Sequence, residues 1–153
     1  MSFDRLIRKI VETKNPTVVG LDPKLEYIPE ELKAEAYAKY GKTLEGAAEA
    51  ILSFNKGIID AICDVVPAVK PQCAFYERFG WQGMKALAET IAYAKEKGMF
   101  VIIDGKRNDI GSTMTAYAVA HLGDVEVEGE VYTPFGGDAL TVNGYLGTDG
   151  ISP

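Results

Sequence analysis

Short apolar runs alternate along the chain with longer segments in which apolar residues recur every three or four positions. The runs fall at 17–23, 65–72, 99–106 and 139–145. The first three are rich in Val, Ile, Leu or Phe and have Pro or Gly beside them, a pattern typical of strands that are buried on both faces. Four such strands separated by helical segments predict a parallel sheet covered by helices.

The segments between the runs predict helices. A polar segment, 24–43, includes a short predicted helix over Glu30–Tyr40. From Leu44 to Ile62 the apolar residues keep the i, i+3, i+4 spacing of an amphipathic helix, and Thr43 is its predicted N-cap. A second amphipathic helix is expected to end at Gly98, directly after a short run of charged residues.

The ends of the chain give weaker patterns. A last helix is predicted to begin near Asn108 or Asp109 and to end at Gly123. The segment 124–137 contains several glycines and a proline, so we expect a loop there. The first nine residues mix charged and apolar side chains, which argues against a signal peptide, and no element is predicted for them.

Composition narrows the class of protein. The 153 residues suit one domain over 1–153. The apolar fraction of 47% and the charged fraction of 25% fit a soluble globular protein, and no run is long enough for a membrane span. A net charge of −6 argues against a general basic surface for nucleic acid. Cys63 and Cys73 are too few for a disulfide framework and fit a reducing, cytoplasmic environment.

Charged residues gather where the predicted strands end, which is where parallel sheets covered by helices place their chemistry. Lys70 ends the second run, Asp104 and Lys106 end the third, and Asp109 follows at the next turn. Because side chains alternate along a strand, Asp104 and Lys106 are expected on one face, which points inward in a barrel. The four residues could form an array of alternating charge. A structural ion-pair network, with Asp109 as a helix N-cap, is the plainer alternative.

The segment from Asp104 to Ile110 resembles the Asp-x-Lys-x-x-Asp-Ile signature of the orotidine 5′-phosphate decarboxylase family. The segments 19–23, 54–55, 69–72 and 141–147 resemble the bacterial subgroup with longer chains. The resemblance implies an α/β fold, a (β/α)8 TIM barrel of which this chain supplies about the first four βα units. It also implies a cytoplasmic lyase of pyrimidine biosynthesis that decarboxylates orotidine 5′-monophosphate to UMP without a metal or other cofactor.

The same resemblance implies roles for single residues around the substrate. Lys106 would protonate C6 of the pyrimidine, Asp104 would lie against the departing carboxylate, and Lys70 would orient Asp104 and the ribose hydroxyls. Asp22 would bind the ribose. Asn143 is expected on the substrate side.

The resemblance also implies a homodimer with shared active sites and no membrane or nucleic-acid partner. Asp109, Ile110 and Thr113 would reach across the dimer interface into the partner's site. Gly144 follows Asn143 where many relatives have proline, which should loosen this turn without removing a functional group.

Length is the main departure from the family pattern. A (β/α)8 barrel needs about 250 residues and normally binds phosphate near strands seven and eight, so we expect this chain to be the N-terminal half of the enzyme. Two alternatives stay open. One is a sister phosphosugar decarboxylase or aldolase that uses Mg²⁺, although Lys70 and Lys106 would compete with a cation at Asp22, Asp104 and Asp109. The other is a non-catalytic half-barrel that docks to a complementary half.

Overall fold

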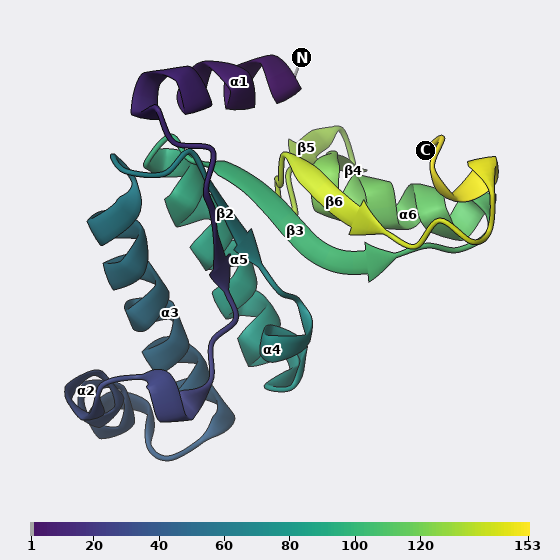
Figure 1. Ribbon diagram of the computed structural model, residues 1–153. Helices are drawn as coiled ribbons and strands as arrows, with labels where there is room; N and C mark the ends of the chain where they lie inside the picture. The colour runs from purple at the N-terminus through teal and green to yellow at the C-terminus, as the bar shows by residue number, and fades with distance from the viewer. Residues whose placement is uncertain (1) are drawn as a thin grey trace.

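The structure, a computed structural model, describes residues 2–153, except for the side chain of Ser2. Four parallel strands form its main sheet, in the order β1-β2-β3-β6 (Figure 1). The strands are β1 (Val18–Leu21), β2 (Ala68–Pro71), β3 (Phe100–Arg107) and β6 (Ala139–Val142). The four strands expected from the apolar runs, and their parallel arrangement, are therefore confirmed.

Helices connect these strands, and four of them fall in segments that the sequence predicts to be helical. They are α2 (Glu30–Tyr40), α3 (Leu44–Ile62), α4 (Ala74–Glu77), α5 (Gly80–Glu96) and α6 (Gly111–Leu122), with single 3-10 turns at Leu25–Tyr27 and Thr148–Gly150. Thr43 caps α3 as predicted, because its hydroxyl oxygen accepts a hydrogen bond from the N–H of Gly46 at 3.1 Å. Gly98 follows α5 with a φ of +75°, the left-handed conformation that glycine adopts readily after a helix.

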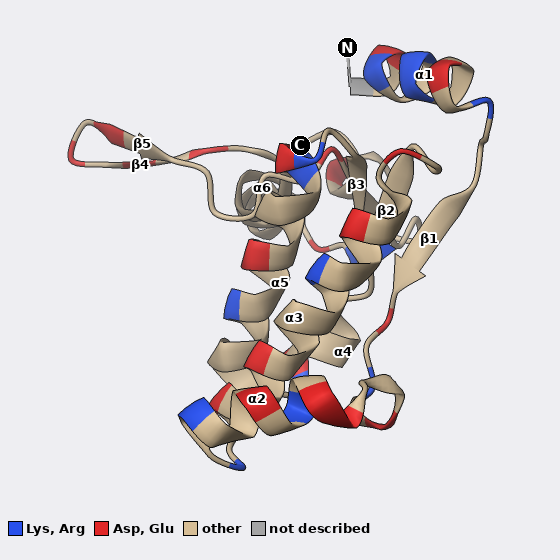
Figure 2. Ribbon diagram, turned by 90° about the vertical axis from the view of Figure 1, so that its left-hand side faces the viewer, with Lys and Arg blue, Asp and Glu red and all other residues tan. Residues whose placement is uncertain are grey.

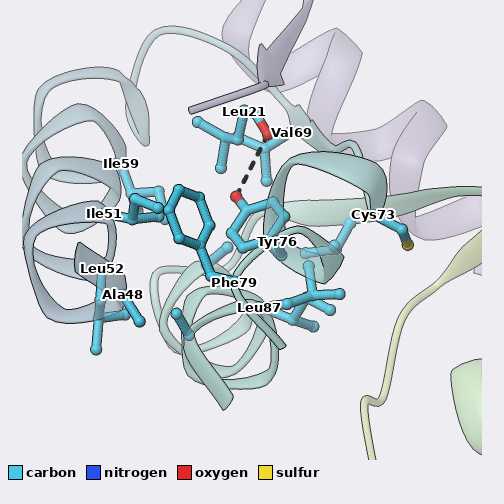
Figure 3. Packing of buried hydrophobic residues seen from close by; sticks show 14 of the residues in the cluster. Leu21, Ala48, Ile51, Leu52, Ile59, Val69, Cys73, Tyr76, Phe79 and Leu87 are labelled. Atoms are coloured by element: carbon cyan, nitrogen blue, oxygen red, sulfur yellow. Dashed lines mark hydrogen bonds between the residues drawn. The ribbon is translucent and has the colours of Figure 1, made fainter. Parts of the chain in front are cut away.

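The pairing of residues between the strands shows which side chains lie on each face of the sheet. Val19 of β1 is paired with Val69 of β2, which is paired with Val101 of β3, so these three side chains share one face. This face packs against α3 and α5, and the hydrophobic core lies between (Figure 3). Fully buried members of this core include Leu21, Ile51, Ile59, Val69 and Leu87.

The other face of the sheet carries the polar residues near the carboxyl ends of the strands. Gly20 is paired with Lys70, and Gln72 forms an isolated bridge with Asp104. Since alternate residues of a strand share a face, Lys70 and Gln72 lie on the same side of the sheet. The core-facing valines thus hold the strands against the helices, while the opposite face presents the candidate chemistry.

The first helix of the structure, α1 (Ser2–Thr13), lies in a part of the chain for which the sequence analysis predicts no element. Phe3, Ile7 and Val11 recur four residues apart, a helical spacing that would have indicated it. The ring of Phe3 lies 6.2 Å from that of Phe100, the first residue of β3. The helix therefore lies at the end of the sheet where the strands begin, away from the polar residues (Figure 1).

A second difference concerns the segment 124–137, where a loop is expected. The structure has a hairpin there, β4 (Val125–Val127) paired antiparallel with β5 (Glu130–Tyr132), and Figure 2 shows it extending away from the body of the molecule. The φ angles of Glu128 and Gly129 are +50° and +91°. Two positive φ values suit a two-residue hairpin turn, so the glycine marks a turn between strands rather than a loop.

Within residues 2–153, no helix has both the length and the apolar character that crossing a membrane would require.

Candidate active site

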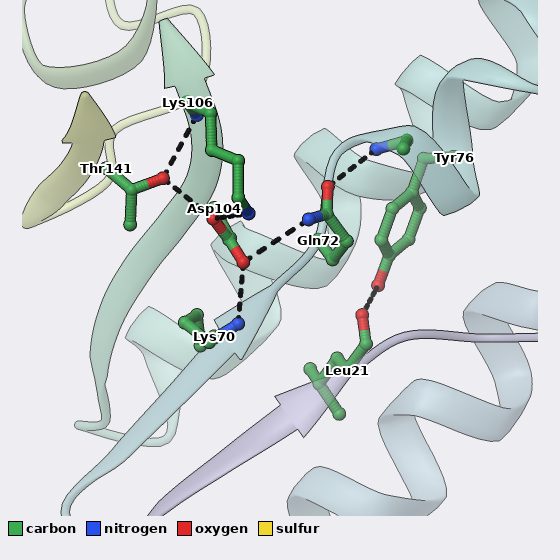
Figure 4. Close-up of polar contacts among 8 residues, drawn as sticks. Leu21, Lys70, Gln72, Tyr76, Asp104, Lys106 and Thr141 are labelled. Carbon is green, nitrogen blue, oxygen red and sulfur yellow. Dashed lines mark hydrogen bonds and ion pairs between the residues drawn. The ribbon is translucent and has the colours of Figure 1, made fainter. Parts of the chain in front are cut away.

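Asp104 lies at the centre of a group of polar side chains at the carboxyl ends of the strands (Figure 4). Its side chain is 9% exposed. The ammonium of Lys70 donates to Oδ2 at 2.7 Å, and the ammonium of Lys106 donates to Oδ1 at 2.7 Å. Each oxygen of one nearly buried carboxylate therefore receives a charge-assisted hydrogen bond.

Two neutral groups complete the surroundings of the carboxylate. Gln72 donates through Nε2 to Oδ2 at 3.3 Å, and Thr141 donates through its hydroxyl to Oδ1 at 2.7 Å. Neither residue is among the site residues expected from the sequence. Alternation along the strand would have found Gln72, two positions after Lys70, whereas Thr141 depends on the register between β3 and β6, which no local pattern fixes. We call Lys70, Gln72, Asp104, Lys106 and Thr141 the Asp104 cluster.

The charge of Asp104 is fixed by these partners. Burial would raise the pKa of the carboxyl group, but the hydrogen bonds from Lys106, Lys70 and Thr141 outweigh it. The pKa of Asp104 is therefore held far below its ordinary value, and the group is an anion throughout the neutral range. A lone buried anion would be costly, and here it is matched by two cations.

Lys106 reaches Asp104 from an irregular part of β3. The flanking pairs are Ile103 with Leu140 and Arg107 with Val142. Three residues, 104–106, thus lie opposite Thr141 alone, which is a bulge. Lys106 has a φ of +49°, a left-handed conformation that costs a residue with a side chain about 1–3 kcal/mol. Simple alternation, the basis of our expectation for Lys106, does not describe this bulged backbone.

Contacts made by Arg107 and Gly105 stabilise the same bulge. The guanidinium of Arg107 donates through Nη1 to the main-chain oxygen of Gly105 at 2.6 Å and pairs through Nη2 with Glu77 of α4. A side chain at Gly105 would come within 3.0 Å of Leu140. The absence of a side chain at this position therefore lets β3 and β6 approach each other where the bulge occurs.

Asp22, expected at the ribose, lies directly after β1. A methyl group at Gly20 would lie 3.6 Å from the carboxylate of Asp22. Because Gly20 is paired with Lys70, β1 is adjacent to the strand that carries Lys70, and Asp22 follows β1 at the same end of the sheet. Within residues 2–153 it makes no hydrogen bond to Lys70 or Asp104. It lines a hollow of about 310 Å³ together with Tyr27 and with residues of β1 and α3.

Of the three residues expected at a dimer interface, Asp109 is half-buried and the other two are exposed. Asp109 accepts a hydrogen bond from the N–H of Ile110 at 2.8 Å, and Ile110 is 66% exposed. Thr113 is also exposed. The helix α6 begins at Gly111, two or three residues later than predicted, so the alternative reading of Asp109 as its N-cap is wrong. Within the described chain Asp109 makes no hydrogen bond to the Asp104 cluster.

Asn143 follows β6 at the same end of the sheet. Its side-chain oxygen accepts a hydrogen bond from the N–H of Tyr145 at 3.0 Å, and its main-chain oxygen accepts one from the side chain of Asn108. The side-chain oxygen is therefore engaged in a local turn. The amide nitrogen of Asn143 is the part of this side chain with which a substrate could interact.

The Asp104 cluster suits acid–base chemistry on a bound organic molecule. The ammonium of Lys106 is fixed against Asp104, yet its side chain is 65% exposed, so it can reach a ligand above the sheet. Within residues 2–153, no three His, Cys, Asp or Glu side chains lie where they could share a metal ion. A fixed ammonium beside a fixed carboxylate can deliver a proton to a carbon that develops negative charge.

Comparison with known proteins gives a consistent set of relatives. Residues 18–153 match the model of the Orotidine 5'-phosphate decarboxylase / HUMPS family. The orotidine 5′-phosphate decarboxylase of Rhodopirellula baltica is 48% identical over 144 residues, which cover 94% of this chain and 46% of that protein. That of Clostridium acetobutylicum is 40% identical over 153 residues, which cover 100% of this chain and 47% of that protein.

Solved structures agree with the sequence matches. The OMP decarboxylase of Leishmania donovani is 28% identical and superposes with a TM-score of 0.72, over 99% of this chain and 48% of that one. The chain spans about half the length of the curated relatives it matches. Its four parallel strands and their helices are the first part of a (β/α)8 TIM barrel, as expected. With most of its length matched by the family model, the chain belongs to the Orotidine 5'-phosphate decarboxylase / HUMPS family.

Proposed function

We propose that the protein decarboxylates orotidine 5′-monophosphate to UMP in pyrimidine biosynthesis, as a homodimer and without a metal or cofactor. The observation that carries this proposal is the pair of ammonium groups, from Lys70 and Lys106, on the two oxygens of Asp104. Membership of the family, and relatives that carry the decarboxylase name, support the choice of substrate.

Lys106 is the proposed proton donor. Loss of CO₂ from C6 of the pyrimidine leaves an electron pair in the plane of the ring, where no π system can delocalise it. An ammonium held at that carbon stabilises the developing negative charge and then transfers a proton to it. The hydrogen bond of 2.7 Å between Lys106 and Asp104 supports this role, because it fixes the direction of the Lys106 side chain.

Asp104 is the proposed neighbour of the substrate carboxylate. Two carboxylates in contact repel each other, and the repulsion disappears as CO₂ leaves. Binding energy from distant parts of the substrate, the phosphate above all, can offset the cost of bringing them together. The low pKa of Asp104 supports this role, because a protonated carboxyl group would not repel the substrate.

The remaining residues are proposed to hold the substrate. Lys70, 34% exposed, would contact the ribose hydroxyls while it orients Asp104. Asp22 would accept a hydrogen bond from a ribose hydroxyl, and Asn143 would donate to the substrate through its amide nitrogen.

Asp109, Ile110 and Thr113 are proposed to enter the active site of the partner subunit. The exposure of Ile110 and Thr113 supports this assignment, because burial of an exposed apolar side chain such as Ile110 by a second chain is favourable.

A Mg²⁺-dependent phosphosugar enzyme is the second candidate, since the family description extends beyond the decarboxylase. The two differ in their response to a chelator. We expect the protein, expressed at its full natural length, to convert orotidine 5′-monophosphate to UMP at the same rate with and without EDTA. Formation of UMP and CO₂ would be followed by chromatography and a coupled CO₂ assay. No turnover of this substrate, or turnover abolished by EDTA and restored by Mg²⁺, would contradict the proposal.

A further inference from the structure

Thr141 has a hydroxyl group whose two hydrogen bonds join the main chain of Lys106 to the side chain of Asp104. Its oxygen accepts from the N–H of Lys106 at 3.0 Å and lies 2.7 Å from Oδ1 of Asp104. An N–H can only donate and a carboxylate can only accept, so the direction of both bonds is fixed. The hydroxyl proton therefore points at Asp104, and the hydroxyl lone pair points at Lys106.

The bulge makes the first of these hydrogen bonds necessary. Residues 104–106 of β3 lie opposite Thr141 alone, so regular strand pairing is interrupted where Lys106 adopts its left-handed conformation. A main-chain N–H at an interrupted ladder needs another acceptor. The hydroxyl of Thr141 supplies it and so holds the backbone from which the Lys106 ammonium extends.

The second hydrogen bond sets how the two ammonium groups share Asp104. Lys70 and Gln72 donate to Oδ2, whereas Thr141 and Lys106 donate to Oδ1. With two donors on each oxygen, the carboxylate is held in one orientation (Figure 4). Without the hydroxyl, Oδ1 would have Lys106 as its single donor, and the carboxylate could rotate toward the lysine.

We infer that Thr141 is a positioning residue for the decarboxylation, which fixes the Lys106 ammonium and the Asp104 carboxylate relative to each other. This inference rests on the proposed function. Thr141 acts through Lys106 and Asp104 and is not itself required to touch the substrate. Its loss should therefore slow the chemical step more than it weakens binding of the substrate.

The test compares Thr141→Val, which keeps the shape and removes the hydroxyl, with Thr141→Ser, which restores the hydroxyl. Thr13→Val is the matched control, because the Thr13 hydroxyl donates to the main-chain oxygen of Lys9 at 2.9 Å, in the helix at the opposite end of the sheet. In the full-length protein we expect Thr141→Val to lower kcat by about 10- to 100-fold with KM changed by less than about threefold. We expect Thr141→Ser to recover most of the rate, and Thr13→Val to keep it.

Several results would overturn the inference. They are an unchanged kcat in a folded Thr141→Val protein, a fall in kcat that serine does not reverse, and a rise in KM alone. If the valine variant does not fold, Thr141→Ala must show the same fall in kcat. If the unmodified protein does not decarboxylate the substrate, the proposed function fails, and the inference is decided by ¹³C NMR titration of the Asp104 carboxyl group. An unchanged titration in Thr141→Val would then refute the positioning role.

Discussion

Lys106 and Lys85 carry the same ammonium group at nearly the same exposure, 65% and 63% of the side chain, yet they have different surroundings. Lys106 contacts Asp104 at 2.7 Å, whereas Lys85 lies 3.8 Å from Glu89 on the surface of α5. We expect Lys106→Ala to remove nearly all turnover without unfolding the protein, and Lys85→Ala to change neither. Steady-state rates and thermal unfolding of both variants would check this. More than about a tenth of the rate in Lys106→Ala would contradict the proton-donor role.

Asp104 makes the free energy of unfolding of the protein depend on pH. Its pKa is lowered in the folded state, so its contribution to the free energy of unfolding is complete above the ordinary aspartate pKa of about 4 and is lost as the pH falls below it. We expect Asp104→Asn to be less stable than the unmodified protein by about 1–3 kcal/mol near pH 7, because two ammonium groups lose their shared anion. The difference should narrow as the pH falls below about 4.

Urea unfolding of both proteins across this pH range would measure the effect. A difference that stays constant down to pH 3 would show that the charge of Asp104 is not its source.

At the scale of the elements, two glycines on neighbouring helices test how closely the helices pack. A side chain at Gly83 of α5 would collide with the main-chain oxygen of Tyr76, whereas a side chain at Gly57 of α3 would meet nothing within 4 Å. Tyr76 donates its hydroxyl to the main-chain oxygen of Leu21 at 3.3 Å, which ties α4 to the first strand. We expect Gly83→Ala to lower the free energy of unfolding by about 1–3 kcal/mol.

The matched change, Gly57→Ala, should raise the free energy of unfolding by up to about 1 kcal/mol, since alanine favours a helix over glycine. Denaturant unfolding of the two variants gives both values. Equal effects of the two substitutions would mean that helix propensity, and not the contact with Tyr76, decides the outcome at Gly83.

The elements also show which parts of this structure could be predicted from the sequence. The core strands and α3 were predictable because burial leaves its period in the apolar residues, and Thr43 was predictable because a cap acts within four residues. The bulge at Lys106 and the contribution of Thr141 were not predictable. They depend on the register of β6 against β3, which is set by packing between segments more than thirty positions apart, as the Lys106–Thr141 hydrogen bond shows.

At the scale of the whole molecule, the candidate active site and the hydrophobic core lie on opposite faces of the sheet. One face of the sheet packs on α3 and α5, while the other carries the Asp104 cluster at the carboxyl ends of the strands. Asp109 and Ile110 follow β3 at this end, where Asp109 is half-buried and Ile110 is exposed. If a second subunit covers them, one subunit supplies the Asp104 cluster and the other supplies Asp109 to each active site.

A mixture of two inactive variants tests this sharing in the full-length protein. When Lys106→Ala and Asp109→Ala subunits exchange freely, half of the dimers are hybrids, and each hybrid has one site with both residues intact. We therefore expect the mixture to recover about a quarter of the unmodified rate. The control is a mixture of Lys106→Ala and Lys70→Ala, whose residues bind the same Asp104 and so leave no intact site in a hybrid. Subunit exchange would be verified by native mass spectrometry. A lack of recovery in the first mixture despite exchange would place Asp109 in the active site of its own subunit. Equal recovery in both mixtures would show that the recovered rate does not come from shared active sites.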